Sequence, residues 1–75
     1  MTRPQDSADL ILELRQRLEL TQEQFAAHLG VTFPTVNRWE NRRAKPSRLA
    51  LQSIRGLLEQ MGESGQDLLT KYFSS

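Results

Sequence analysis

A chain of 75 residues with 37% hydrophobic content is long enough for one small domain and too short for two separate cores. It has no cysteine, which excludes disulfides and thiolate metal sites, and no apolar run approaches the roughly 18 residues of a membrane span. The net charge is only +1, but residues 31–50 hold five cations against Glu40 alone, while the segments on either side are net negative. We therefore expect a cytoplasmic domain without cofactor or metal, whose basic block is either a polyanion-binding surface or an ordinary solvated charge run.

The apolar residues predict five helices and no strands, beginning with a helix near Ser7. Residues 1–6 are polar and include Pro4, so we expect a disordered N-terminal arm followed by a single domain over residues 7–75. Ser7 is the predicted cap of the first helix. The apolar residues of this helix recur at helical spacing: Leu10, Ile11, Leu14 and Leu18.

The second helix is predicted between Thr21 and Gly30. Gln24 follows Thr21 by three residues, which is the spacing of a capping box. Gly30 is the residue type best suited to a left-handed exit from a helix. The predicted second helix therefore has a defined start and a defined end.

The third helix is predicted from Phe33 to about Asn41, with Thr32 as its cap. Pro34 falls in its first turn, where the missing N–H breaks no internal hydrogen bond. The short connection forces the second and third helices to pack at a steep angle, so residues 22–41 are predicted to form a helix-turn-helix.

The fourth helix is predicted to open at Ser47, after a loop over residues 42–46. Gly56 weakens this helix by roughly 1 kcal/mol relative to alanine, so we expect close packing there. Residues 62–65 are predicted to form a turn before a last helix from about Gln66. Ser64 and Asp67 are spaced for its cap.

The outward face of the third helix is the predicted functional surface. On a helical wheel Val36 and Trp39 point inward. The residues that point the other way combine hydrogen-bonding groups with apolar surface: Phe33, Pro34, Asn37, Arg38 and Asn41. Such a mixture suits base edges and thymine methyl groups in a DNA major groove, where arginine can bind guanine and asparagine can bind adenine.

The segment LTQEQFAAHLGVTFPTVNRWENRRAKPS, residues 20–47, resembles the lambda-repressor-like helix-turn-helix family of phage repressors and Cro proteins, often called Xre-type. The resemblance rests on the Thr-Gln-x-x-Phe-Ala opening, on Gly30, on the Val36 and Trp39 positions and on Trp-Glu-Asn. It implies an all-α, five-helix lambda-repressor-like DNA-binding domain with the helix-turn-helix at the second and third helices. The residues that it assigns to base contacts are Thr32, Phe33, Pro34, Asn37 and Arg38.

Contacts to the DNA backbone are expected around this reading surface. The resemblance assigns Gln22, at the start of the second helix, to phosphate. Cations that follow the third helix are expected to position the protein without specifying sequence. The complete set of expected backbone-contacting residues is Gln22, Thr35, Asn41, Arg42, Arg43 and Lys45.

Two features depart from the family pattern. Many members have glycine at the position of Arg42, so either Asn41 adopts the left-handed conformation or the loop turns differently. Phe33 and Pro34 replace a pair that is often polar, which favours shape or methyl contacts there over hydrogen-bonded readout.

Arg15 lies on the packed side of the first helix, between Ile11 and Leu18. A cation in this position needs a partner, because desolvation of an unpaired charge costs several kcal/mol. Glu40 is the candidate, and the resemblance supports the pair. We predict a partly buried Arg15–Glu40 salt bridge that fixes the angle of the reading helix.

The residue inventory opposes an enzyme, since the chain has one isolated histidine, no cysteine and no glycine-rich phosphate loop. The predicted function is a DNA-binding transcriptional regulator, with a repressor favoured. An antitoxin-type regulator with a toxin partner and a protein-interaction adaptor stay open as alternatives. We expect a homodimer on two DNA half-sites, formed through C-terminal residues: Leu57, Leu58, Met61, Leu68, Leu69, Tyr72 and Phe73.

Overall fold

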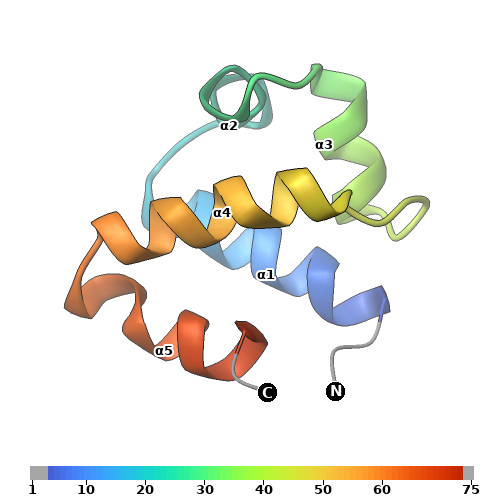
Figure 1. Ribbon diagram of the computed structural model, residues 1–75. Coiled ribbons are helices and arrows are strands. Elements are labelled where there is room, and N and C mark those ends of the chain that lie inside the picture. Colours follow the sequence, from blue (N-terminus) through green and yellow to red (C-terminus); the bar gives the residue numbers. More distant parts are fainter. Residues whose placement is uncertain (1–3, 74–75) are drawn as a thin grey trace.

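The computed structural model describes the backbone of residues 4–73 and the side chains of residues 7–73, and this part of the chain is five α-helices without a strand (Figure 1). The helices are α1 (Pro4–Arg17), α2 (Gln22–Leu29), α3 (Phe33–Glu40), α4 (Arg48–Gln60) and α5 (Glu63–Phe73). The predicted all-α, five-helix architecture is confirmed. None of the described helices is long and apolar enough to cross a bilayer.

Helix α1 begins earlier than predicted. Pro4 lies in its first turn, where proline supplies a helical φ angle and the missing N–H breaks no hydrogen bond. Residues 4–6 are therefore helical, which corrects the disordered arm predicted over residues 1–6; residues 1–3 lie outside the described part. Ser7 is a buried helical residue with 8% exposure, so its predicted role as a cap is wrong.

The predicted start and end of α2 are confirmed. Thr21 Oγ1 accepts from the Gln24 backbone N–H at 3.1 Å, and Gln24 Oε1 accepts from the Thr21 backbone N–H at 2.9 Å. Gly30 ends the helix with φ +73°, and the Val31 N–H then closes the turn on the Ala26 carbonyl at 2.9 Å. These contacts fix the direction in which the chain enters α3.

Helix α3 starts as predicted, with the Thr32 hydroxyl accepting from the Thr35 N–H at 3.4 Å. It packs against α1 and α2, while α4 packs along α5. Figure 1 shows α2 and α3 at one end of the molecule and α5 at the opposite end. The most deeply buried side chains come from every helix and form one core: Ile11, Leu14, Phe25, Val36, Ile54, Leu58 and Leu68.

The junction of α4 and α5 differs from the prediction. Helix α5 begins at Glu63, directly after Gly62 with φ +64°, and not near Gln66. The first turn of α5 approaches α4 closely, because a Cβ at Gly65 would overlap the Leu58 backbone carbonyl oxygen. The turn predicted over residues 62–65 is therefore mostly helix.

Two local predictions near this junction are also wrong. A Cβ added at Gly56 would meet no atom within 4 Å, so Gly56 is not a site of close packing. Ser64 and Asp67 both lie within α5 and do not cap it. Asp67 instead binds Arg17 of α1 through two hydrogen bonds of 2.7 Å.

Candidate nucleic-acid interface

The two faces of α3 have opposite character, as the helical wheel predicts. Val36 is fully buried and Trp39 is 4% exposed, so both hold the helix on the core. Phe33 is 45% exposed, which places its ring outward. Pro34 and Arg38 lie on the same outward side of the helix, while Asn37 is half-buried at the edge of the face.

A shallow concavity lies along this outward face. Its lining brings four of the five predicted base-contacting residues together with two predicted backbone contacts: Phe33, Pro34, Asn37, Arg38, Asn41 and Arg43. Thr32, the fifth predicted base contact, lies at the start of α3 and is exposed, but it does not line the concavity. The predicted reading surface is thus continuous and accessible in the structure.

Within the part of the chain that the structure describes, cations without an internal partner are confined to one region. Among the described side chains, those with neither a carboxylate nor an aromatic partner are Arg38, Arg43, Lys45 and Arg48. All four reach solvent and follow one another from α3 through the loop to the first residue of α4. Arg48 belongs to the basic block but was not predicted as a site residue; its sequence signal was only its position at a helix start.

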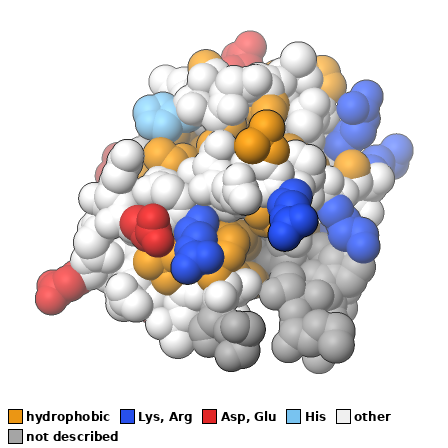
Figure 2. Space-filling view, viewed as in Figure 1, with side chains coloured by type: hydrophobic (Ala, Val, Ile, Leu, Met, Phe, Trp, Pro, Cys, Tyr) orange, Lys and Arg blue, Asp and Glu red, His pale blue; other side chains and the backbone are white. Residues whose placement is uncertain are grey.

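The described Lys and Arg side chains outside this region each have a partner within the protein. Arg15 pairs with Glu40, Arg17 with Glu13 and Asp67, and Arg55 with Glu59. The Lys71 ammonium lies 5.3 Å from the centre of the Tyr72 ring. In Figure 2 the Lys and Arg side chains gather mainly on the side where Figure 1 places α3 and the loop after it, and the visible Asp and Glu side chains lie elsewhere.

The backbone of the loop after α3 shows how the chain turns with Arg42 where many family members have glycine. Asn41 has φ −93°, whereas Arg42 itself has φ +60°. Arg42, and not Asn41, therefore adopts the left-handed conformation that glycine would adopt without strain. Arg42 Nη2 also donates to Asp9 Oδ1 at 2.9 Å, so this guanidinium is turned toward α1 and is less available to phosphate than its neighbours.

Arg15 and Glu40 form the pair expected from the sequence. The Arg15 Nε–H donates to Glu40 Oε2 at 2.7 Å and Nη2 donates to Oε1 at 3.0 Å, a two-point contact that links α1 to α3. The Arg15 and Glu40 side chains are 19% and 9% exposed. Hydrogen bonding to Glu40 raises the pKa of Arg15 above its usual value, which keeps the guanidinium charged.

Amide side chains extend this pair toward the outward face of α3. Gln22 Nε2 donates to Glu40 Oε1 at 2.9 Å, and Asn37 Nδ2 donates to Gln22 Oε1 at 3.2 Å. Asn41 Nδ2 donates to Asn37 Oδ1 at 3.1 Å and to the Asn37 carbonyl at 2.8 Å. This chain of hydrogen bonds was not predicted from the sequence, because no local spacing signals a contact between the start of α2 and the middle of α3.

The two threonines at the start of α3 contact each other. The Thr32 and Thr35 hydroxyl groups lie 2.9 Å apart, and Thr32 also caps the helix. Their hydroxyls therefore serve α3 itself in this structure, and a DNA contact would add to these bonds.

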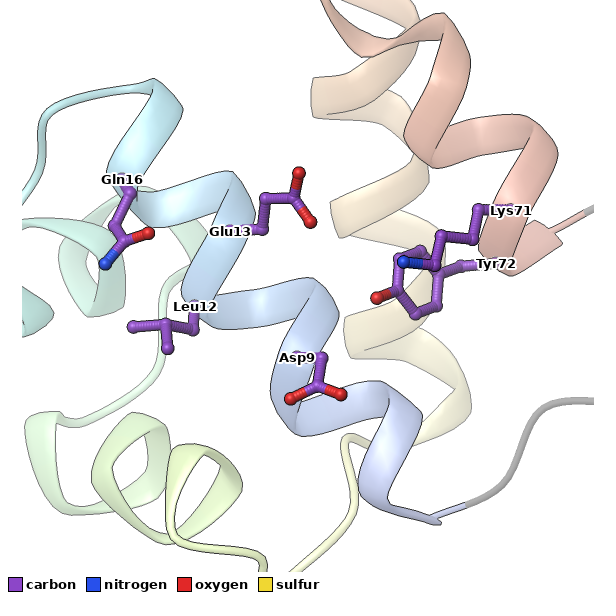
Figure 3. A pocket seen from close by; sticks show the side chains of 6 residues that line it. All are labelled: Asp9, Leu12, Glu13, Gln16, Lys71 and Tyr72. Carbon is purple, nitrogen blue, oxygen red and sulfur yellow. The ribbon is translucent and has the colours of Figure 1, made fainter.

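A second concavity lies between α1 and α5, away from the outward face of α3. It is lined by Asp9, Leu12, Glu13, Gln16, Lys71 and Tyr72, and Figure 3 shows Lys71 and Tyr72 reaching from α5 toward α1. The carboxylates of Asp9 and Glu13 would repel a phosphate backbone. This surface is therefore unsuited to nucleic acid.

The described residues contain no group of three or more histidine, cysteine or carboxylate side chains that could hold a metal. His28 is exposed on α2 and has no role in the surface described above.

The chain also matches the model of a protein family. This family, described as Helix-turn-helix, matches residues 11–59, which is more than half of the chain. The match covers the end of α1, both helices of the predicted motif and nearly all of α4. No curated protein and no solved structure matches the chain.

Proposed function

This chain belongs to the lambda-repressor-like (Xre-type) helix-turn-helix family, a family of DNA-binding regulators, and on that premise we propose that it is a sequence-specific transcriptional repressor that inserts α3 into the major groove of double-stranded DNA. Occupying an operator is enough to block transcription, so repression needs no further catalytic or binding surface. Its proposed place of action is the cytoplasm.

The observation that carries this proposal is the distribution of unpartnered cations. Arg38, Arg43, Lys45 and Arg48 form a continuous series beside α3, while every other described cation has a partner within the protein. An unpaired guanidinium or ammonium loses no internal contact when it binds phosphate. The series thus fits a polyanion that lies along α3 and the start of α4.

Within this arrangement the residues divide into reading and positioning roles. Arg38 and Asn37 are proposed to bind base edges, and Phe33 and Pro34 to contact thymine methyl groups or groove walls. Arg43, Lys45 and Arg48 are proposed to bind phosphates, where they set the register of the protein without reading sequence. The remaining proposed DNA contacts already make internal bonds and would contribute less: Gln22, Thr32, Thr35, Asn41 and Arg42.

A homodimer is proposed for DNA binding, because one small module covers few base pairs. Half-sites lie about 34 Å apart, and the domain measures 28 × 25 × 19 Å, so two copies fit side by side on successive turns. Leu58, Leu68 and Tyr72 are buried in the core, so we leave them out of the proposed dimer surface. The half-buried residues of the expected set are Leu57, Met61, Leu69 and Phe73.

Two alternatives use the same scaffold. An antitoxin-type regulator would bind DNA through the same face and a toxin elsewhere. A protein-interaction adaptor would use the basic face for an acidic protein partner, although the cores of protein interfaces are depleted in lysine.

A salt series on a mixed-sequence duplex separates DNA binding from the adaptor role. If three cations of each protomer bind phosphates, the dissociation constant should rise steeply between about 50 and 200 mM salt, with a log–log slope of about three per bound protomer. Selection of bound sites from a random duplex library then gives the operator and its symmetry. A dissociation constant independent of salt, or a library without enriched sites, would contradict the proposed function.

A further inference from the structure

We infer that the Arg15–Glu40 ion pair sets the donor and acceptor pattern that Asn37 presents to DNA, and that Gln22 is the positioning residue that transmits it. The inference rests on the proposed function and deepens it. It concerns the orientation of three amide groups, from Gln22 through Asn37 to Asn41.

The orientation is determined first at Glu40. Two N–H groups of Arg15 donate to this carboxylate, one to each oxygen, so both oxygens act as acceptors. An ionised carboxylate only accepts hydrogen bonds. Gln22 therefore has to turn its NH2 group toward Glu40, as the 2.9 Å contact shows, and this leaves Gln22 Oε1 facing α3.

The orientation of the Gln22 amide in turn sets the orientation of the Asn37 amide. Because Gln22 Oε1 is an acceptor, Asn37 has to offer its NH2 group, and Nδ2 lies 3.2 Å from that oxygen. Asn37 Oδ1 then points toward Asn41, whose Nδ2 donates to it at 3.1 Å.

The hydrogen bonds of Asn41, the last of the three amides, require the same orientation. Asn41 Nδ2 also binds the Asn37 backbone carbonyl at 2.8 Å, and a carbonyl can only accept. The NH2 group of Asn41 must therefore face Asn37, which requires an acceptor there. The Glu40 carboxylate at one end and the Asn37 backbone carbonyl at the other can only accept hydrogen bonds, and both require the same orientation of the three amides.

This orientation leaves Asn37 with a defined pair of free positions. A side-chain amide has two N–H donors and two acceptor positions, and the internal bonds use one of each. One N–H and one lone pair remain, which match N7 and the N6 amino group of adenine. Asn37 lines the concavity on the outward face of α3, so this pair is presented at the proposed reading surface.

Gln22→Met tests the inference, since methionine keeps the length of the side chain and removes both hydrogen-bonding groups. Arg15 and Glu40 are left untouched, so the fold is preserved, which a thermal melt checks. Gln60→Met is the matched control, because Gln60 is an exposed glutamine at the end of α4. Asn37→Ala and the double variant Gln22→Met/Asn37→Ala complete the set.

The measurement is the base preference at each position of the operator that the wild-type chain selects from a random duplex library. A good bidentate base contact gives roughly 5- to 150-fold discrimination. We expect Gln22→Met to reduce discrimination several-fold at the position where Asn37→Ala reduces it, and the double variant to lose no more than the larger single loss. The control should leave discrimination unchanged.

Three results would overturn the inference. Gln22→Met could weaken binding to all sequences equally, as loss of a phosphate contact would, or it could change the base preference at another position of the operator. The third such result is a double variant in which the two single losses of discrimination multiply. The side-chain NH2 group of Asn37 gives a readout without DNA. Its ¹⁵N relaxation should report a rigid amide in the wild-type protein and a mobile one in Gln22→Met, and equal mobility in both would also overturn the inference. A wild-type chain that enriches no site would refute the proposed function, whereas the relaxation measurement still decides the orientation.

Discussion

The guanidinium of Arg15 and the carboxylate of Glu40 meet in parallel, with N–O distances of 2.7 and 3.0 Å, and this contact joins α1 directly to α3. The remaining guanidinium nitrogen of Arg15, Nη1, donates to the Leu20 carbonyl at 3.0 Å. Arg15 therefore connects α1, the loop that leads to α2, and α3.

Arg15→Ala should lower stability and DNA affinity together. Removing the arginine leaves the Glu40 carboxylate, which is 9% exposed, with only the Gln22 amide as a partner. We expect the free energy of unfolding to fall by about 3 kcal/mol, the low end of the range for a broken buried pair because Arg15 keeps partial exposure. Urea unfolding and a duplex-binding titration measure both effects, and unchanged values in both would show that the pair is dispensable.

The left-handed backbone at Arg42 predicts an unusual order of two substitutions. Arg42→Gly and Arg42→Ala both remove the exposed ion pair with Asp9, but only glycine adopts a left-handed φ without strain. The glycine variant should be more stable than the alanine variant by about 1 kcal/mol. Urea unfolding of the two variants provides the comparison, and an alanine variant as stable as the glycine variant would contradict a left-handed residue 42.

Local sequence signals predicted the caps of α2 and α3 correctly, whereas the predicted caps of α1 and α5 were wrong. Thr21 and Gln24 formed the expected capping box, and Gly30 adopted the expected left-handed exit. The errors have two causes, which are local signals that fit more than one structure and packing contacts that the sequence does not show. Proline at position 4 is compatible with a first helical turn as well as with a disordered arm, and Gly65 could be recognised as a packing residue only once α5 was placed on α4.

The two helical glycines should respond oppositely to alanine. Gly56→Ala meets no neighbouring atom, so it should raise the free energy of unfolding by about 0.5–1 kcal/mol through the lower helix cost of alanine. Gly65→Ala places a methyl group against the Leu58 backbone carbonyl, so it should lower stability by about 1–3 kcal/mol. Each variant serves as the control for the other in a thermal or urea melt. Equal shifts for both would mean that α5 does not approach α4 at Gly65.

The sequence was enough to predict which face of α3 points outward, but not which contacts the residues of the candidate site make. The helical wheel placed Phe33 and Arg38 outward and Trp39 inward, because periodicity alone decides that. The hydrogen bonds from Glu40 through Gln22 to Asn37 join residues up to 18 positions apart, and they exist only once α2 crosses α3. The sequence likewise could not show which cations of the basic block are already paired, as Arg42 is.

Asp67 should contribute to stability in mildly acidic solution. Two hydrogen bonds from Arg17 lower the pKa of Asp67 from its usual 3.8 to about 2. Since the folded pKa is lower than the unfolded one, the stabilisation is complete above about pH 4 and is lost as the pH falls from about 4 to 2. Asp67→Asn should therefore reduce the melting temperature above about pH 4, and its difference from wild type should shrink toward about pH 2.

Glu63→Gln is the control for Asp67→Asn, because it removes a carboxylate from the same helix that has no ion-pair partner among the described residues. Melting curves between about pH 2 and pH 7 should converge with wild type at low pH more strongly for Asp67→Asn than for the control. A constant difference between wild type and Asp67→Asn over this range would contradict the lowered pKa of Asp67.

Arg38 and Lys45 should separate base reading from phosphate binding, although both are cations without an internal partner among the described residues. Arg38 lines the concavity on the outward face of α3, whereas Lys45 lies in the loop beyond it. Arg38→Ala should cost about 1–3 kcal/mol of binding free energy and relax the preference at one base position. Lys45→Ala should weaken binding to all sequences alike and reduce the log–log salt slope by about one per bound protomer. The two variants are compared on the selected operator, on single-base changes of it and across about 50–200 mM salt, and equal, sequence-independent losses for both would mean that Arg38 reads no base.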